Sequence, residues 1–131
     1  MKRKIIVTQD GSHTISIPEM NVTYHSVHGA IQESKHIFIQ AGLHAIHQST
    51  INILEIGFGS GLNAILTLAE AGEKNICYTA IEPYPLSVDQ AASLNYCKQL
   101  NKSGLENTLC KCIPASGSSW LLFLLFLHYI R

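Results

Sequence analysis

Two glutamates bracket a run of alternating glycines near the middle of the sequence. Glu55 stands two residues before Gly57, further glycines occupy positions 59 and 61, and Glu82 comes 21 residues after the last of them. Glycines at this spacing let a backbone turn sharply and approach a ligand closely, and an acid at the end of the next strand can accept both hydroxyls of a ribose. The pattern therefore predicts a site for an adenosine-containing cofactor.

The residues around the glycines distinguish between such cofactors. No Lys-Ser or Lys-Thr pair follows them, so the turn is not a phosphate-gripping nucleotide loop. The dinucleotide fingerprint needs its third glycine where this chain has Leu62, so NAD fits imperfectly. S-Adenosyl-L-methionine carries no phosphate, its sulfonium and ammonium favour an acid such as Glu55, and its carboxylate suits the amino end of a helix. An NAD-dependent oxidoreductase and a glycine turn in an unrelated fold remain alternatives.

The segments around the turn predict an α/β unit over residues 51–107. Residues 51–56 and 75–82 read as parallel strands covered on both faces. Helices are expected from Leu62 to Ala71 and from Ser87, which forms a capping box with Gln90, to about residue 100. Strand, helix, strand, helix in this order indicates a parallel sheet with right-handed crossovers, as in a Rossmann-like domain.

Residues 1–50 are expected to form a β-hairpin and a helix ahead of that unit. Two β-branched runs within residues 3–17 flank Asp10-Gly11, a pair that suits a tight turn. A helix is expected within residues 24–42, because apolar or small side chains recur there at steps of three and four residues. This predicted stripe consists of Ile31, Ser34, Phe38 and Ala41.

Composition restricts the classes of function. The chain has 131 residues, 47 % of them hydrophobic and 14 % charged, which is enough for one globular core. Nine basic and nine acidic residues cancel, so no global charge favours nucleic acid, although residues 2–4 form a small basic cluster. The four cysteines lack zinc-ribbon spacing and no signal peptide is evident, so we expect a reduced cytoplasmic protein without a metal site.

Three quoted segments carry a family resemblance: "DGSHTISIPEMNVTYHSVHGAIQESKHIFIQAGL", "ILEIGFGSGLNAILTL" and "YTAIEPYPLS". Together they make residues 1–107 similar to the methyltransferases that complete 5-methylaminomethyl-2-thiouridine at the tRNA wobble position. The resemblance implies a class I S-adenosylmethionine methyltransferase fold and methylation of the primary amine of 5-aminomethyl-2-thiouridine. It also implies tRNA as a partner, and an FAD-dependent oxidoreductase, fused or separate, acting in the same pathway.

The resemblance also implies roles for particular residues. Glu55 and the three glycines of the turn would line the methionine end of the cofactor, and Glu82 its ribose. Pro83 and Tyr84 could pack against the adenine. Four residues fall on the family's amino-terminal motif, beside the cofactor or the amine: Tyr24, Ser26, Gly29 and Glu33. No catalytic residue is assigned, because the family's Asp-Ala-Phe-x-Pro motif is missing and no aspartate follows Asp89.

Residues 108–131 do not resemble the family's continuation. They contain two cysteines, no acid, and an apolar run over residues 120–127 that is shorter than the roughly 20 residues of a membrane-spanning helix. A short strand or helix is one interpretation, and we favour a tail foreign to the family, as after a frameshift or truncation. The family's next strand would then be missing beside residues 51–56. We expect an unpaired strand edge, exposed apolar surface and weak cofactor binding, so a non-catalytic cofactor-binding fragment is the alternative function.

Overall fold

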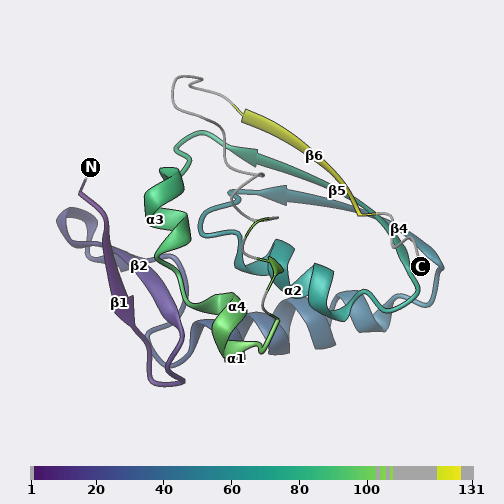
Figure 1. The fold of residues 1–131 in the computed structure, drawn as a ribbon, viewed down its shortest axis with the longest axis horizontal. Helices are drawn as coiled ribbons and strands as arrows, with labels where there is room; N and C mark the ends of the chain where they lie inside the picture. The colour runs from purple at the N-terminus through teal and green to yellow at the C-terminus, as the bar shows by residue number, and fades with distance from the viewer. Residues whose placement is uncertain (1, 103, 106, 108–120, 128–131) are drawn as a thin grey trace.

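The computed structural model describes residues 2–102, 104, 105, 107 and 121–127. Its strands form two three-stranded sheets, ordered β1–β2–β3 and β4–β5–β6 (Figure 1). The strands are β1 (Lys4–Val7), β2 (His13–Ile17), β3 (Val22–Thr23), β4 (Thr50–Ile56), β5 (Asn75–Glu82) and β6 (Leu121–Leu127). The helices are α1 (Ala30–Ser34), α2 (Leu62–Glu70), α3 (Val88–Ala92) and α4 (Tyr96–Gln99), with the π-helix η2 (Lys35–Gln40) and the 3-10 turns η1 (Pro18–Met20) and η3 (Leu43–Ala45).

The second sheet contains the expected strand–helix–strand unit. β4 pairs in parallel with β5 over its whole length, from Thr50 opposite Asn75 to Ile56 opposite Ile81, and α2 connects the two strands. β6 pairs antiparallel with the other side of β5. The fold is therefore mixed α/β, and the strand order leaves β4 at an edge of the sheet among the described residues, as expected.

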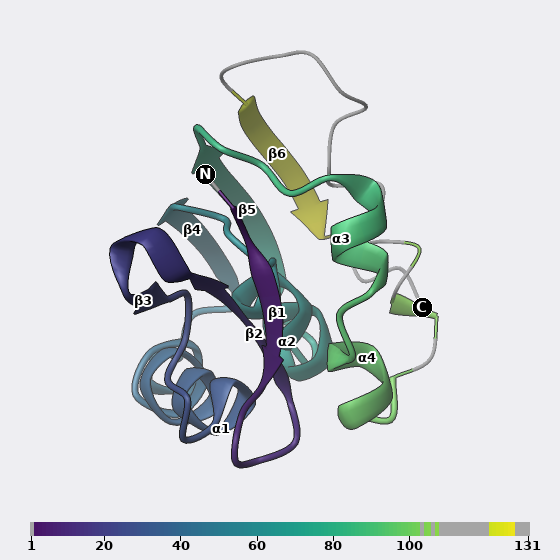
Figure 2. The same cartoon turned by 90° about the vertical axis from the view of Figure 1, so that its left-hand side faces the viewer.

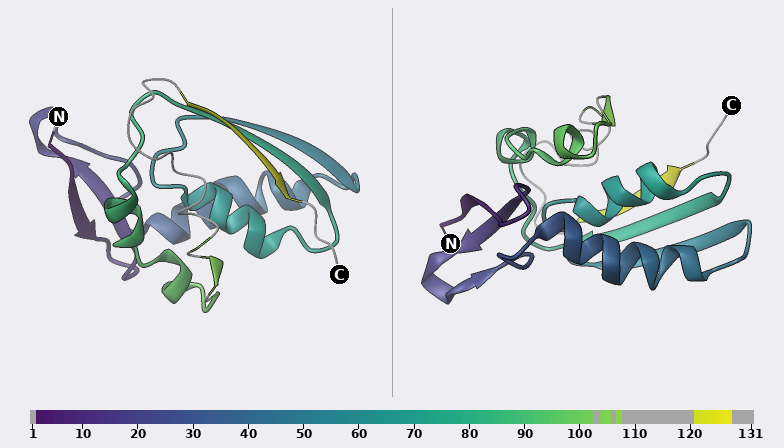
Figure 3. Two further views of the ribbon diagram at one scale, coloured as in Figure 1. Left: turned by 45° about the horizontal axis from the view of Figure 1, so that its top comes forward. Right: turned by 90° about the horizontal axis from the view of Figure 1, so that it is seen from below.

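The prediction that these strands are covered on both faces is wrong for the described residues. α2 and the continuous α1–η2 helix lie across the same face of the sheet (Figure 3). Tyr78 and Ala80 of β5 point toward that face and are 1 % exposed. Leu54 and Ile56 of β4 point the other way and are 65 % and 72 % exposed. An apolar run indicates that a strand packs against a core. It does not indicate whether one face of the strand is covered or both.

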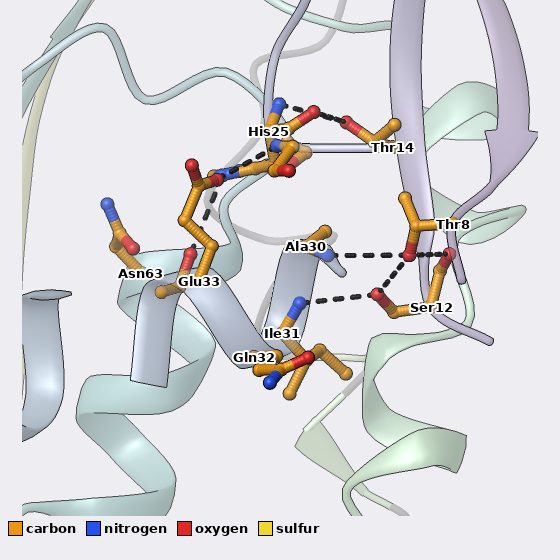
Figure 4. Close-up of polar contacts among 12 residues, drawn as sticks. Thr8, Ser12, Thr14, His25, Ala30, Ile31, Gln32, Glu33 and Asn63 are labelled. Carbon is orange, nitrogen blue, oxygen red and sulfur yellow. Dashed lines mark hydrogen bonds and ion pairs between the residues drawn. The ribbon is translucent and has the colours of Figure 1, made fainter. Parts of the chain in front are cut away.

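The amino-terminal hairpin forms with its turn at Asp10-Gly11, as predicted, and its turn residues also cap α1. The side chains of Thr8 and Ser12 accept hydrogen bonds from the N–H groups of Ala30 and Ile31, at 3.4 and 3.2 Å (Figure 4). The Asp10 carboxylate accepts the third N–H of α1, that of Gln32, at 2.9 Å. A Cβ atom at Gly29, just before α1, would lie 2.8 Å from the Asp10 carboxylate. The short helix is thus anchored by polar side chains more than fifteen positions earlier.

Two predicted helices differ from the observed ones. The first begins only at Ala30 and passes into a π-helix, whose extra residue per turn moves the apolar stripe, so that Ile39 is buried and Ala41 is exposed. The second is broken between α3 and α4, although its Ser87 capping box is present. Asn95 leaves the helical path there, accepts the His13 N–H at 2.9 Å and donates to the Gly11 carbonyl at 2.9 Å.

Candidate functional site

A cleft of about 1190 Å³ opens at the carboxyl ends of β4 and β5. The amino-terminal hairpin lies in front of the second sheet when the molecule is viewed from that side (Figure 2). The walls of the cleft come from the end of β2 and the segment after it, from the glycine turn, from the start of α2 and from the end of β5. The cleft brings together six of the eight predicted cofactor-binding residues: Tyr24, Glu55, Gly57, Gly59, Glu82 and Pro83. Sequence positions almost sixty residues apart therefore meet in one place.

The glycine turn needs glycine at all three positions. Gly57, Gly59 and Gly61 have φ values of +87°, +56° and +74°, in the left-handed region that other residues rarely adopt. A Cβ at Gly59 would also lie 3.1 Å from the ring of Tyr24. The turn is joined to the neighbouring strand, because the Gly57 N–H donates to the Ile81 carbonyl at 2.7 Å. Gly57, Phe58 and Gly59 of the turn line the cleft, and the two glycines put backbone rather than side chains there.

Glu82, at the end of β5, holds two of the cleft walls together. Its Oε2 accepts the Gly59 N–H at 2.7 Å, and its Oε1 accepts the Tyr84 N–H at 2.7 Å. The residue is only 7 % exposed. Each carboxylate oxygen has a second lone pair, so Glu82 can still accept a hydroxyl from the cleft while it stabilises the turn.

Glu55 is the second acid of the cleft and lies in a polar cluster. Its two oxygens accept the Asn63 side-chain amide at 2.9 Å and the Tyr78 hydroxyl at 2.8 Å. Burial raises the pKa of Glu55, the two hydrogen bonds oppose this, and the nearby Glu82 charge adds to it. Burial, reinforced by the Glu55 carboxylate, also raises the pKa of Tyr78, so its hydroxyl stays a donor.

Tyr24 and the turn after β5 form the outer walls. Burial raises the pKa of Tyr24; Arg3 opposes that rise and Glu82 adds to it. The Arg3 guanidinium also donates to the carbonyls of Tyr84 and Pro85, at 3.0 Å for Pro85. One member of the basic cluster predicted from the sequence is therefore used to fix the Pro83–Pro85 turn against the hairpin.

The remaining predicted site residues lie outside the cleft. Gly61 is the buried residue immediately before α2, and its carbonyl accepts the Ile65 N–H. Glu33 lines a smaller neighbouring cavity of about 370 Å³, and its Oε2 accepts the Ser26 N–H at 2.9 Å. Gly29 is buried beneath Asp10. None of these three residues lines the cleft.

Three residues of the site were not predicted from the sequence. His25 and Asn63 each line both cavities, and Tyr78 donates to Glu55. Tyr78 had a signal, because strand alternation places it on the same face as Glu82. For Asn63 the only signal in the sequence was its position in the first turn of α2. His25 had no such signal, because its place in the site depends on Ser60, 35 positions later.

Comparison with known proteins gives no relative: no family model, curated protein or solved structure matches the chain. Among the described residues, no three histidine, cysteine, aspartate or glutamate side chains are placed to share a metal ion. In the same part of the chain, every helix is too short or too polar to cross a lipid bilayer. The structure thus defines a mixed α/β protein with a cleft beside a glycine turn, and its function has to be argued from that cleft.

Proposed function

We propose that the cleft binds S-adenosyl-L-methionine and that the chain is the cofactor-binding part of an amine methyltransferase with a Rossmann-like, class I fold. The observation that carries this proposal is the turn of three positive-φ glycines between two acids, Glu55 and Glu82, that line one cleft. The cofactor supplies an electrophilic methyl group. The protein has to bind its charged and hydroxyl groups and hold an acceptor in line with that methyl group.

The polar groups of the cleft suit this cofactor. Two glutamates make the cleft acidic, which favours a sulfonium and an ammonium group. Asn63 Oδ1 is buried and has no hydrogen-bond partner among the described residues, so it offers an acceptor next to Glu55. Of the described residues that line the cleft, none is lysine or arginine, which disfavours the pyrophosphate of NAD.

Particular residues have roles in this proposal. Glu55 and Asn63 face the methionine ammonium, and the start of α2 faces its carboxylate. Glu82 accepts the ribose hydroxyls. Tyr84, which is 67 % exposed at the rim, covers the adenine together with Pro83.

The acceptor follows from the resemblance of residues 1–107 to the wobble-uridine methyltransferases. We propose the primary amine of 5-aminomethyl-2-thiouridine in tRNA as the substrate class, in a cytoplasmic setting. An FAD-dependent oxidoreductase, fused or separate, would act in the same pathway. The segment from Tyr24 to Phe38 supports this choice, because it is one of the two segments that make the resemblance specific and it also supplies three residues of the cleft wall: Tyr24, His25 and Phe38.

A non-catalytic cofactor-binding module is the second candidate. It is favoured by the position of β4, which has no partner on its outer side among the described residues. In the family that this chain resembles, a further strand lies there and brings an aspartate. Methyl transfer to tRNA, followed with a labelled methyl group, separates the candidates: both predict cofactor binding, but only the enzyme predicts transfer.

Calorimetric titration tests the binding step. S-Adenosylmethionine should give saturable heat, whereas NAD at the same concentrations should give none. Glu82→Gln should weaken S-adenosylmethionine binding at least tenfold, because a hydrogen bond to a charged group contributes about 1.5–3 kcal/mol. Glu70→Gln is the matched control, since Glu70 lies in the last turn of α2, outside the cleft. Equal affinities of the two variants, or preference for NAD, would contradict the proposal.

A further inference from the structure

The two cavities of the site meet at three residues. His25, Phe38 and Asn63 line both the larger cleft and the smaller cavity of about 370 Å³. The smaller cavity is walled mainly by apolar side chains from η2, η3 and β4, and Glu33 lies at its polar end. If the larger cleft holds the cofactor, a second reactant can reach the transferable methyl group through this junction. His25 is the histidine that stands there.

Both the backbone and the side chain of His25 are held by contacts with other segments. Its backbone N–H donates to the Thr14 hydroxyl at 3.0 Å. Its Nε2 lies 3.3 Å from Ser60 Oγ in the glycine turn, and Ser60 Oγ accepts the Tyr96 hydroxyl at 3.0 Å. Its Nδ1 lies 3.8 Å from the Glu33 carboxylate (Figure 4). The side chain is 17 % exposed, so a ligand in either cavity can still touch the ring.

The chain of hydroxyls allows Nε2 to be the ring nitrogen that accepts a proton. Ser60 accepts from Tyr96, so its own hydrogen can point at Nε2, and the ring hydrogen then sits on Nδ1, which lies 3.5 Å from Ser34 Oγ and 3.8 Å from the Glu33 carboxylate. The contact of 3.3 Å is longer than an ordinary hydrogen bond, so a better donor from the cavity can replace Ser60 at little cost.

The surroundings keep this ring neutral. Burial lowers the pKa of His25 below its ordinary value, and the Glu33 carboxylate opposes that shift only in part. Glu55 and Glu82 line the same cleft from β4 and β5, and Tyr24 comes from the adjoining segment. A neutral imidazole near pH 7 is ready to take a proton, and Glu33 would then stabilise the imidazolium.

We propose that His25 is the proton acceptor for the amine that is methylated, with Ser60 and Tyr96 as positioning residues; this rests on the proposed function. The lone pair of the amine nitrogen forms the new N–C bond, the C–S bond breaks, and its electron pair stays on sulfur. The surplus proton of the nitrogen passes to His25 Nε2 and from there to water. Charge balances, because one sulfonium becomes a thioether and one imidazole becomes an imidazolium.

Nitrogen NMR of the imidazole rings tests this contact directly. The chain is first saturated with S-adenosylhomocysteine, and the nucleoside 5-aminomethyl-2-thiouridine is then added. The Nε2 resonance of His25 should shift and its titration midpoint should change, while His36, which is exposed and lines neither cavity, should not respond. Ser60→Ala should keep the response and change the tautomer ratio of His25, because the hydrogen bond to Nε2 is lost.

The outcomes separate the two proposals. If S-adenosylhomocysteine does not bind, the proposed function fails, and the role of His25 fails with it. If it binds and the amine leaves the His25 resonances unmoved, only the role of His25 is wrong. Where methyl transfer is measurable, His25→Gln should lower kcat at least tenfold and remove the acidic limb of its pH profile, with His36→Gln as control. Unchanged kcat and pH profile in His25→Gln would also overturn the inference.

Discussion

Replacing Asp10 by alanine should destabilise the protein through a helix that lies elsewhere in the sequence. The Asp10 carboxylate accepts hydrogen bonds from Thr8 Oγ1 at 2.7 Å, from the Ser12 N–H at 3.0 Å and from the Gln32 N–H at 2.9 Å. It thus holds the hairpin turn and the first turn of α1 at the same time. The change Asp10→Ala removes these acceptors and leaves the N–H groups to water.

The expected loss is about 1–2 kcal/mol of unfolding free energy. Loss of a helix cap alone costs about 0.5–2 kcal/mol. Hydrogen bonds to a charged group are worth about 1.5–3 kcal/mol each, but Asp10 is exposed, so water compensates for most of that amount. Asp10→Asn keeps one carbonyl acceptor and should cost about half as much. Asp89→Ala, at an exposed aspartate in the first turn of α3, is the control.

The effect should depend on pH in a defined direction. Burial opposes ionisation of Asp10, but the bonds from Ser12, Thr8 and the Gln32 N–H outweigh it and lower its pKa from 3.8 to about 2. Because the pKa in the folded state is the lower one, the contribution of Asp10 is fully present above the unfolded pKa. It should be lost progressively as the pH falls from about 4 through about 2. Urea denaturation at pH 7 measures the full contribution, and at pH 2 most of it should be lost.

A second substitution makes the test stricter. A Cβ at position 29 would lie 2.8 Å from Asp10 Oδ2, so Gly29→Ala should displace the carboxylate and cost stability in the wild type. In an Asp10→Ala background the same change should cost clearly less, a coupling that a double-mutant cycle detects. Equal unfolding midpoints of wild type and Asp10→Ala, or strict additivity of the two changes, would refute this account of the cap.

Three further predictions follow from the cleft and the sheet. Gly59→Ala should lower the unfolding free energy by about 1–2 kcal/mol because of the positive φ, and by a further amount because the new Cβ would press on the Tyr24 ring. Gly57→Ala has open space around its Cβ and should show only the backbone cost, and urea denaturation measures both variants. Tyr78→Phe should raise the pKa of Glu55 further in a carbon NMR titration, because a donor to its carboxylate is lost. Leu54→Lys should change the unfolding free energy by less than about 0.5 kcal/mol and reduce self-association in sedimentation experiments, because Leu54 is 65 % exposed on β4.

The sequence predicts well those elements that depend on local chemistry. The glycine turn was predictable because glycine adopts the positive φ values found there far more readily than other residues, and the positions of Glu55 and Glu82 beside it were predictable from their distance to it. The hairpin turn at Asp10-Gly11 and the Ser87 capping box are likewise determined by a few adjacent side chains. Residues 75–82 were predicted as a strand with the observed bounds.

The features that were missed all depend on long-range contacts. Asn95 breaks a helix because its amide pairs with the backbone of the hairpin, and the sequence around Asn95 does not indicate this pairing. The buried position in the π-helix is Ile39, which the predicted stripe did not include, and the predicted Ala41 is exposed. The importance of His25 arises from Ser60, 35 positions later. The composition of residues 51–56 also could not show that one face of the sheet lies open.

The contacts between the hairpin and the segment near α4 have a consequence for the time course of synthesis. Arg3 donates a hydrogen bond to a carbonyl 82 positions later, and the carbonyl of Gly11 accepts hydrogen bonds from donors 84 and 88 positions later. At about 5–20 residues per second, a ribosome needs roughly 4–16 s to add 80 residues. During that interval the hairpin can form locally but cannot dock. The cleft, whose outer wall includes Tyr84, therefore acquires that wall late in synthesis.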